Sequence, residues 1–133
     1  MKKLKISETA FASQVEDLLR LYHWHWCHFR PGRTTKGWRT SLTGHKGLPD
    51  YIAVRPPRLV FAELKDEYSK TTPEQQAWLD LLDECQKAII ANPMEVRGEV
   101  ATLMLGKEVW TLIIPEVYLW RPSQFDEVRR ILG

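Results

Sequence analysis

Two carboxylates and a lysine form the strongest candidate for a chemical site. Asp50 ends the segment GLPD, and Glu63 and Lys65 stand two residues apart in FAELK. Alternate residues of a strand point to one face, so Glu63 and Lys65 should share a face, and a hairpin would bring Asp50 beside Glu63. Carboxylate oxygens suit Mg²⁺ or Mn²⁺, and a neighbouring lysine can neutralise developing charge or orient a water molecule. The structural alternative is an exposed Glu63–Lys65 ion pair at a strand end.

A second cluster is HWHWCHF at residues 23 to 29, which contains three histidines and Cys27. Zinc sites need ligands that converge on one point, usually from separate segments. Strand alternation would place His28 on the face opposite to His25 and Cys27, and no second cluster follows. We therefore favour a half-buried aromatic strand, and a zinc-binding structural protein is the third hypothesis for the chain.

Charge is distributed unevenly along the sequence. No acidic residue lies between Asp17 and Asp50, whereas this interval contains all four histidines and Arg20, Arg30, Arg33, Lys36, Arg39 and Lys46. A block of one sign attracts polyanions and releases counterions on binding them. Taken alone, the block fits a solvated basic loop as well as a nucleic-acid contact.

Periodicity and caps predict the elements that position these residues. A helix over 8–22 begins at the N-cap Ser7, the aromatic strand follows, and residues 31–47 are expected to form a long basic loop. Strands at 51–54 and 59–64 flank the turn RPPR, and the second should be central and covered on both sides.

The second half of the chain predicts a long helix and a closing strand and helix. Thr72 is the expected N-cap, Pro73 the first helical residue and Gln75 the capping-box partner. The expected buried stripe of this helix is Trp78, Leu81, Leu82, Cys85 and Ile89. The first part of residues 93–114 fits either a helix or a strand, and the second part fits a strand. A strand over 116–120 and a helix capped by Ser123 complete one α/β domain.

Composition is that of an ordinary globular domain, with 133 residues, 44% of them apolar and 27% charged. The opening residues lack a secretory signal, and no apolar run is long enough for a membrane span. The two cysteines, Cys27 and Cys85, match no disulfide framework, which favours a reducing cytoplasmic compartment.

A series of motifs resembles the VRR-NUC branch of the PD-(D/E)xK nucleases. In order along the chain they are Glu8, Trp24, His28, Gly47-Leu48-Pro49-Asp50, Glu63-Leu64-Lys65, the helix opening from Pro73 through Gln75 to Trp78, and Trp120-Arg121-Pro122. The resemblance covers nearly the whole chain. It departs from the family at His23, where glycine is frequent, and at residues 86–115, where an extra element is inserted.

The resemblance implies a restriction-endonuclease-like core, with a central mixed sheet flanked by helices. It implies a Mg²⁺- or Mn²⁺-dependent endodeoxyribonuclease in which Asp50, Glu63 and the Leu64 carbonyl bind metal and Lys65 activates water. Gln75 and Glu8 would complete the site, although Gln75 fits a helix cap equally well. Glu16 competes with Glu8 but is better read as a solvated helix residue. DNA phosphates would be held by Arg30, Arg33, Lys36, Arg39 and Lys46, with His28 near the active face.

Stand-alone relatives in phages and bacteria resemble Holliday-junction resolvases. The resemblance therefore implies branched or duplex DNA as substrate, a homodimer and the cytoplasm of a bacterial or phage-infected cell, with no organic cofactor and no membrane. The alternative is a DNA-binding module without catalysis. Such a module has no need for Asp50, Glu63 and Lys65 together.

Overall fold

The computed structural model describes residues 6–29, 32–34, 37–39, 43–91, 95–97, 100–105 and 107–133. Its centre is a four-stranded sheet in the order β1–β4–β5–β9, with β1 at His25–His28, β4 at Tyr51–Arg55, β5 at Arg58–Leu64 and β9 at Pro115–Trp120. Strands β1, β4 and β5 pair antiparallel, whereas β9 is parallel to β5. The sheet is therefore mixed, as predicted, and the expected strands at 51–54, 59–64 and 116–120 are confirmed within one residue.

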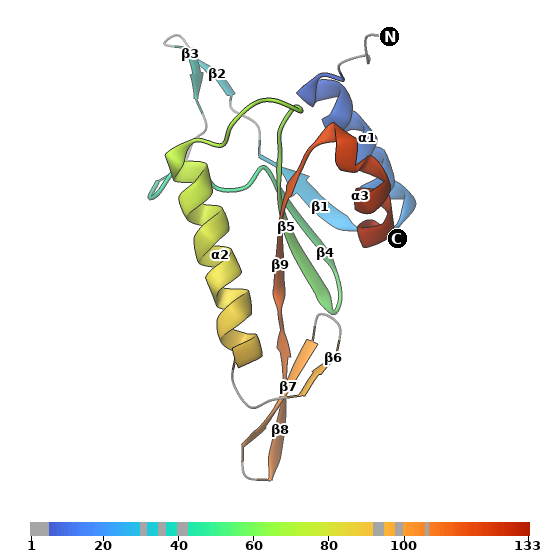
Figure 1. The fold of residues 1–133 in the computed structure, drawn as a ribbon, viewed down its shortest axis with the longest axis vertical. Coiled ribbons are helices and arrows are strands. Elements are labelled where there is room, and N and C mark those ends of the chain that lie inside the picture. Colours follow the sequence, from blue (N-terminus) through green and yellow to red (C-terminus); the bar gives the residue numbers. More distant parts are fainter. Residues whose placement is uncertain are drawn as a thin grey trace.

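Three helices cover the two faces of this sheet. Figure 1 shows α1 (Glu8–Leu21) and α3 (Phe125–Leu132) together on one face and α2 (Pro73–Ala91) along the other. The central strand β5 is thus covered on both sides, which explains its nearly continuous apolar sequence. The expectation of an α/β fold is confirmed. No helix among the described residues has the length and apolarity needed to cross a membrane.

Helix α1 begins at its predicted cap and buries one stripe. The Ser7 hydroxyl accepts a hydrogen bond from the Ala10 N–H at 3.1 Å, which satisfies a donor that the first turn leaves without a partner. Phe11, Val15 and Leu19 follow at helical spacing and are almost fully buried. They pack in one core with apolar side chains of the sheet and of α3. Burial of each contributes about 1.5–3 kcal/mol.

Two arginines and a tryptophan tie α1 and α3 to the end of the sheet where β4 turns into β5. Arg55 and Arg58 lie over the Trp24 ring at 4.6 Å and 5.0 Å from its centroid. Arg58 also makes two hydrogen bonds to the buried Glu116, at 2.7 Å and 2.9 Å. The Trp24 indole donates to the Leu132 carbonyl at 2.9 Å. These charges are therefore paired and structural, and they are at the opposite end of β5 from Glu63.

The predicted buried stripe of α2 is wrong in part. Leu79 is buried, whereas Leu81 is 60% exposed and Cys85 is also exposed. The face toward the sheet is centred on Gln75, Leu79 and Leu82, because Gln75 points into the sheet end. Trp78 and Leu82 of the predicted stripe are half-buried, and the side chain of Ile89 lies outside the described residues.

The long loop predicted over residues 31–47 is wrong in its first half. β2 (Gly32–Thr34) and β3 (Gly37–Arg39) pair antiparallel as a separate two-stranded sheet, with Arg33 opposite Trp38. A two-stranded ribbon satisfies its backbone groups without an apolar face on the core, so no hydrophobic alternation marks it. In Figure 1 this hairpin projects from the end of the molecule at which β5 finishes.

The ambiguous stretch after α2 forms strands. β6 (Glu95–Arg97), β7 (Val100–Leu105) and β8 (Glu108–Ile113) make a separate antiparallel sheet in that order. It lies at the opposite end of the molecule from the β2–β3 hairpin (Figure 1). Together with the last turns of α2 it occupies residues 86–115, the range expected to hold an inserted element.

Ser123 does not cap the last helix, contrary to prediction. A short 3₁₀ turn, η1 (Pro122–Gln124), precedes α3, and Gln124 is the cap residue of α3. The Gln124 side chain accepts a hydrogen bond from the Arg121 N–H at 2.9 Å. The Ser123 N–H instead donates to Glu67 at 3.0 Å, which ties this turn to the loop after β5.

Candidate active site

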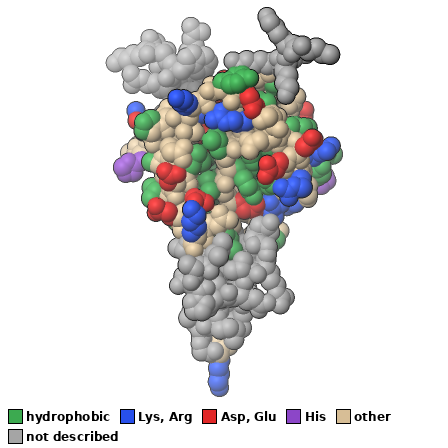
Figure 2. All heavy atoms as spheres, viewed as in Figure 1, with side chains coloured by type: hydrophobic (Ala, Val, Ile, Leu, Met, Phe, Trp, Pro, Cys, Tyr) green, Lys and Arg blue, Asp and Glu red, His purple; other side chains and the backbone are tan. Residues whose placement is uncertain are grey.

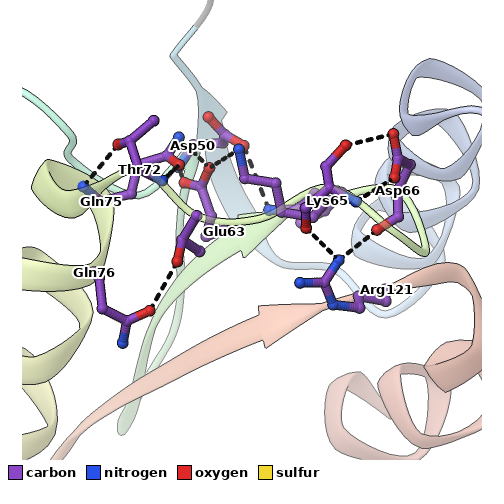
Figure 3. A network of polar contacts seen from close by, with 11 residues as sticks. Asp50, Glu63, Lys65, Asp66, Thr72, Gln75, Gln76 and Arg121 are labelled. Atoms are coloured by element: carbon purple, nitrogen blue, oxygen red, sulfur yellow. Dashed lines mark hydrogen bonds and ion pairs between the residues drawn. The ribbon is translucent and has the colours of Figure 1, made fainter.

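Asp50 and Glu63 meet at one end of the sheet, as their positions predict. Tyr51 pairs with Ala62 in the β4–β5 hairpin, so the next positions outward are Asp50 and Glu63. The Asp50 N–H donates to Glu63 Oε2 at 3.2 Å, and the Leu64 N–H donates to Asp50 Oδ2 at 3.4 Å. The two carboxyl groups are therefore held against each other by the backbone of the opposite strand (Figure 3).

Lys65 completes the predicted constellation. Its Nζ lies 3.9 Å from Glu63 Oε1, and the two side chains are 13% and 2% exposed. The Lys65 N–H donates to the Trp120 carbonyl at 3.1 Å, which continues the β5–β9 pairing past the end of β5. The alternative of an exposed strand-end ion pair is thus wrong, because Glu63 is buried and Lys65 is nearly so.

Two partly desolvated carboxyl groups share a single neighbouring lysine at this site. Burial first, and then the charge of Asp50, raises the pKa of Glu63 from 4.5 to about 8 although Lys65 opposes the rise. Burial above all, helped by the charge of Glu8, also raises the pKa of Asp50, against the lowering effect of the Leu64 N–H and Lys65. Burial and the mutual repulsion therefore favour the protonated form of Glu63 at neutral pH.

Gln75 makes the capping box that the sequence predicts and also contacts the acidic pair. Its backbone N–H donates to Thr72 Oγ1 at 3.2 Å while its Oε1 accepts from the Thr72 N–H at 2.9 Å, a complete capping box. Its Nε2 simultaneously donates to Glu63 Oε1 at 2.8 Å. The amide therefore connects the start of α2 to the acidic pair and fixes the orientation of the Glu63 carboxylate.

The segment before Asp50 packs directly on the first turn of α2. The Trp78 indole donates to the carbonyls of His45 and Lys46 at 3.3 Å and 3.1 Å. Gly47 has φ +95°, and a Cβ there would lie 2.5 Å from the Glu74 carbonyl carbon. Only glycine allows this approach, which sets Pro49 and Asp50 at the same level as Gln75.

Gly47→Ala should lower the free energy of unfolding by about 3 kcal/mol or more, because the positive φ and the backbone collision both penalise a side chain. Gly44→Ala is the matched control. Gly44 also has a positive φ of +105° but open space around it, and we expect a cost of about 1–2 kcal/mol. Urea unfolding of both variants measures the difference, and equal costs would show that the contact with α2 is not close.

Of the two helix glutamates, Glu8 is the one whose charge acts on both Asp50 and Glu63. It is exposed at the start of α1, so it can reach this site only at its edge. Glu16 lies two turns further along and is 8% exposed. The interpretation of Glu16 as a solvated residue is therefore wrong, since Glu16 belongs to the inner face of α1.

His28 lies next to the site through the pairing of β1 with β4. Its ring stacks on Tyr51, with the centroids 4.1 Å apart and the planes 17° apart. The following Phe29 N–H donates to the Asp50 carbonyl at 2.7 Å. The chain leaves the sheet toward the β2–β3 hairpin at Phe29 and returns to it through Gly47–Asp50. Both connections therefore adjoin the acidic pair.

The predicted phosphate-binding residues are described unevenly. Arg30 and Lys36 lie outside the described residues, and Arg33 and Arg39 are placed on β2 and β3 without a description of their side chains. Lys46 is highly exposed, with Nζ 3.9 Å from Glu74 at the start of α2. On the face of the molecule shown in Figure 2, acidic and basic side chains of the described residues are interspersed, and neither charge forms one continuous patch.

The histidine cluster divides between two faces, as alternation predicts. His25 and Cys27 are exposed, whereas Trp26 and His28 are half-buried against Tyr51. His23 has φ +61° in the turn before β1, a conformation that glycine adopts more readily.

The donor set at Asp50 and Glu63 fits Mg²⁺ or Mn²⁺ better than zinc. Within the described ranges, no group of three or more His, Cys, Asp or Glu side chains is arranged to hold a metal ion. Mg²⁺ commonly binds through one or two carboxylates and keeps several waters, so Asp50 and Glu63 are of the type that could hold it. Zinc would need four converging ligands.

One supporting element, the loop after Lys65, was missed in the sequence. Asp66 Oδ1 accepts hydrogen bonds from the N–H groups of Tyr68 and Ser69 at 2.9 Å and 2.7 Å. Arg121 donates to the carbonyls of Asp66 and Ser69 at 2.6 Å and 2.7 Å (Figure 3). Arg121 therefore stabilises this loop, and the Asp-x-x-Ser pattern typical of such turns was the available signal.

Comparison of the chain with models of protein families, with curated proteins and with solved structures finds no match in any of the three.

Proposed function

We propose that the chain is a Mg²⁺- or Mn²⁺-dependent endodeoxyribonuclease of the VRR-NUC type, built on a restriction-endonuclease-like core and selective for DNA structure. The observation that carries this proposal is the pair Asp50 and Glu63. Both carboxyl groups are held together at the end of a mixed sheet, with Glu63 1% exposed and Lys65 beside it. A module that only binds DNA has no use for two buried carboxylates that repel each other.

The chemistry follows from the roles of the chain's own side chains. A divalent cation at Asp50 and Glu63 would supply Lewis-acid stabilisation of charge on the phosphate oxygens. Lys65 positions the attacking water through Nζ and compensates the charge that develops beside it. Gln75 holds the Glu63 carboxylate in one orientation, so that its second oxygen keeps its direction toward Asp50. Glu8 adds negative charge at the outer edge.

The β2–β3 hairpin is the element that we propose to hold the DNA backbone. It leaves the sheet at Phe29, which is bonded to Asp50, and returns through Gly47 against α2. Arg33 and Arg39 lie on its two strands, and Arg30, Lys36 and Lys46 are close to them in the sequence. Phosphate contacts from these residues would position DNA over the acidic pair without reading its sequence, with His28 at the base.

A homodimer is proposed with this activity, because two symmetric cuts in a four-way junction need two sites related by a two-fold axis. Sedimentation at micromolar concentration tests it directly. A monomer alone, with and without junction DNA, would remove the dimer but not the nuclease.

The activity is tested by incubating the protein with a mobile four-way junction, a flap and a linear duplex in Mg²⁺ or Mn²⁺. Wild type should cut the branched substrates, and Lys65→Ala should reduce the rate about 10²–10³-fold, as expected when one donor to developing charge is lost. Lys70→Ala is the matched control, since Lys70 is exposed in the same loop. Equal activity of wild type and Lys65→Ala would overturn the assignment. If both bind DNA equally and neither cuts it, the binding-module alternative leads.

Substitutions of Gln75 and Thr72 separate the structural role of the helix cap from the role of Gln75 at the acidic pair. Gln75→Ala and Thr72→Ala each break the capping box and should each lower stability by about 1 kcal/mol. Only Gln75→Ala also releases Glu63, so its cleavage rate should fall about 10–100-fold while that of Thr72→Ala stays close to wild type. Paired urea unfolding and cleavage assays measure both effects. If the cleavage rate fell in proportion to the loss of stability in both variants, Gln75 would act only as a helix cap.

A further inference from the structure

The loop of residues 66–69 is fixed from several directions. Asp66 accepts hydrogen bonds from two backbone N–H groups and from the Ser69 hydroxyl, the last at 2.7 Å. Arg121 holds two of its carbonyls, and Glu67 accepts from the Ser123 N–H. Lys65, immediately before this loop, is bonded to the Trp120 carbonyl. The loop is therefore ordered as part of the sheet end that carries the acidic pair.

This ordered loop presents one large aromatic side chain to solvent. Tyr68 is 75% exposed, and the other exposed large apolar residues among those described are Ile6, Leu21 and Leu81, all on or just before helices. Three residues of extended chain span at most about 10 Å, so the Cα atom of Tyr68 lies within that distance of the Cα atom of Lys65. That distance equals about three base steps of a DNA strand.

We propose that Tyr68 is a stacking surface for an unpaired nucleobase next to the phosphodiester that is cut. The proposal rests on the proposed function and names its substrate class, which is DNA with unpaired nucleotides at a branch, flap or splayed end. Bases in a duplex already stack on their neighbours, whereas an unpaired base offers a free face to an aromatic ring. Because hydrogen bonds already fix the loop backbone, stacking on Tyr68 requires little further ordering of the chain.

The test compares cleavage of a splayed-arm substrate with cleavage of a fully paired duplex of the same sequence. Tyr68→Ala should reduce kcat/KM on the splayed arm about 5- to 150-fold, the equivalent of about 1–3 kcal/mol of stacking per base, and change the duplex rate much less. Tyr68→Phe should restore the splayed-arm rate. Leu21→Ala, which removes a 63% exposed side chain at the end of α1, is the control and should match wild type. Equal losses on both substrates, or no loss, would overturn the proposal.

A second measurement reads stacking without cleavage. An oligonucleotide with one unpaired 2-aminopurine is titrated with protein in EDTA, so that no strand is cut. Wild type and Tyr68→Phe should quench its fluorescence at saturation and Tyr68→Ala should not. This result would support the stacking site even if no cleavage were found with any metal. Equal quenching by wild type and Tyr68→Ala would overturn it even if the nuclease activity were established.

Discussion

Asp50→Asn should abolish cleavage and at the same time make the metal-free protein more stable. Burial is the main cause of the raised pKa of Glu63, and the charge of Asp50 is the second. Removal of that charge relieves the second part, so the free energy of unfolding at about pH 8 should rise by about 0.5–2 kcal/mol. Cleavage should fall about a thousandfold or more, because several kcal/mol of transition-state stabilisation depend on the bound cation. Urea unfolding in EDTA and cleavage in Mn²⁺ measure the two effects.

The two opposite effects of Asp50→Asn, a loss of cleavage and a gain in stability, separate a functional carboxylate from a structural one. A structural Asp50 would lose stability on substitution, since its carboxylate accepts the Leu64 N–H. Asp17→Asn is the matched control, because Asp17 is exposed on α1 and its ion pair with Arg20 is a surface contact. It should change neither measurement. A less stable Asp50→Asn that retains cleavage would contradict the proposed role.

The metal-free protein should lose stability as the pH rises from about 5 to 8. The pKa of Glu63 is 4.5 in an ordinary environment and about 8 in the fold. Between these values the folded state holds a proton that the unfolded state has released, so the slope is negative, at about 1.4 kcal/mol per pH unit for one proton. The raised pKa of Asp50 acts in the same direction. Thermal unfolding across this range in EDTA measures the slope.

Glu63→Gln identifies the group responsible. It keeps the size of the side chain and removes the titrating carboxyl group, so the slope over this window should become shallower. Mn²⁺ should stabilise wild type most above pH 8, where the carboxylate is ionised and no proton has to leave before the ion binds. An identical slope in wild type and Glu63→Gln would show that another group titrates.

The meeting of Asp50 and Glu63 could be predicted because it needs only local rules. Two short strands separated by RPPR leave a hairpin as the simplest pairing, and the period of two places Glu63 and Lys65 on one face. The caps at Ser7 and Thr72 were also readable, since each depends on residues within three positions. Their confirmation shows how much of a site can be inferred when its geometry is set by neighbours in sequence.

Features that depend on distant partners could not be predicted in this way. Leu81 stands at a helical position that suits a core, yet it is 60% exposed, whereas the polar Gln75 reaches Glu63 on the adjoining strand. Glu16 resembles any helix glutamate, and only the packing of α1 on the sheet buries it. Ser123 has the type of a cap, but Pro122 starts a 3₁₀ turn that moves the beginning of α3 past it. For Leu81 and Glu16, the packing of a helix on the sheet decided between locally equal choices.

Gln75 shows why two readings of one residue need not exclude each other. Its backbone and Oε1 serve the capping box, while Nε2 is free to bond Glu63. A cap that also bonds Glu63 connects the start of α2 to the acidic pair. The sequence contained the capping-box pattern and the motif resemblance, but it could not show that one side chain makes both contacts.

The most direct test of the central claim is a titration of metal-free protein with Mn²⁺, with free Mn²⁺ counted by electron paramagnetic resonance at about pH 8.5. The structure predicts saturable binding by wild type and Asp17→Asn, and loss of that binding in both Asp50→Asn and Glu63→Gln, because the ion needs both carboxylates. Binding that is absent from wild type, or unchanged in the two site variants, would contradict a metal centre at the end of β5.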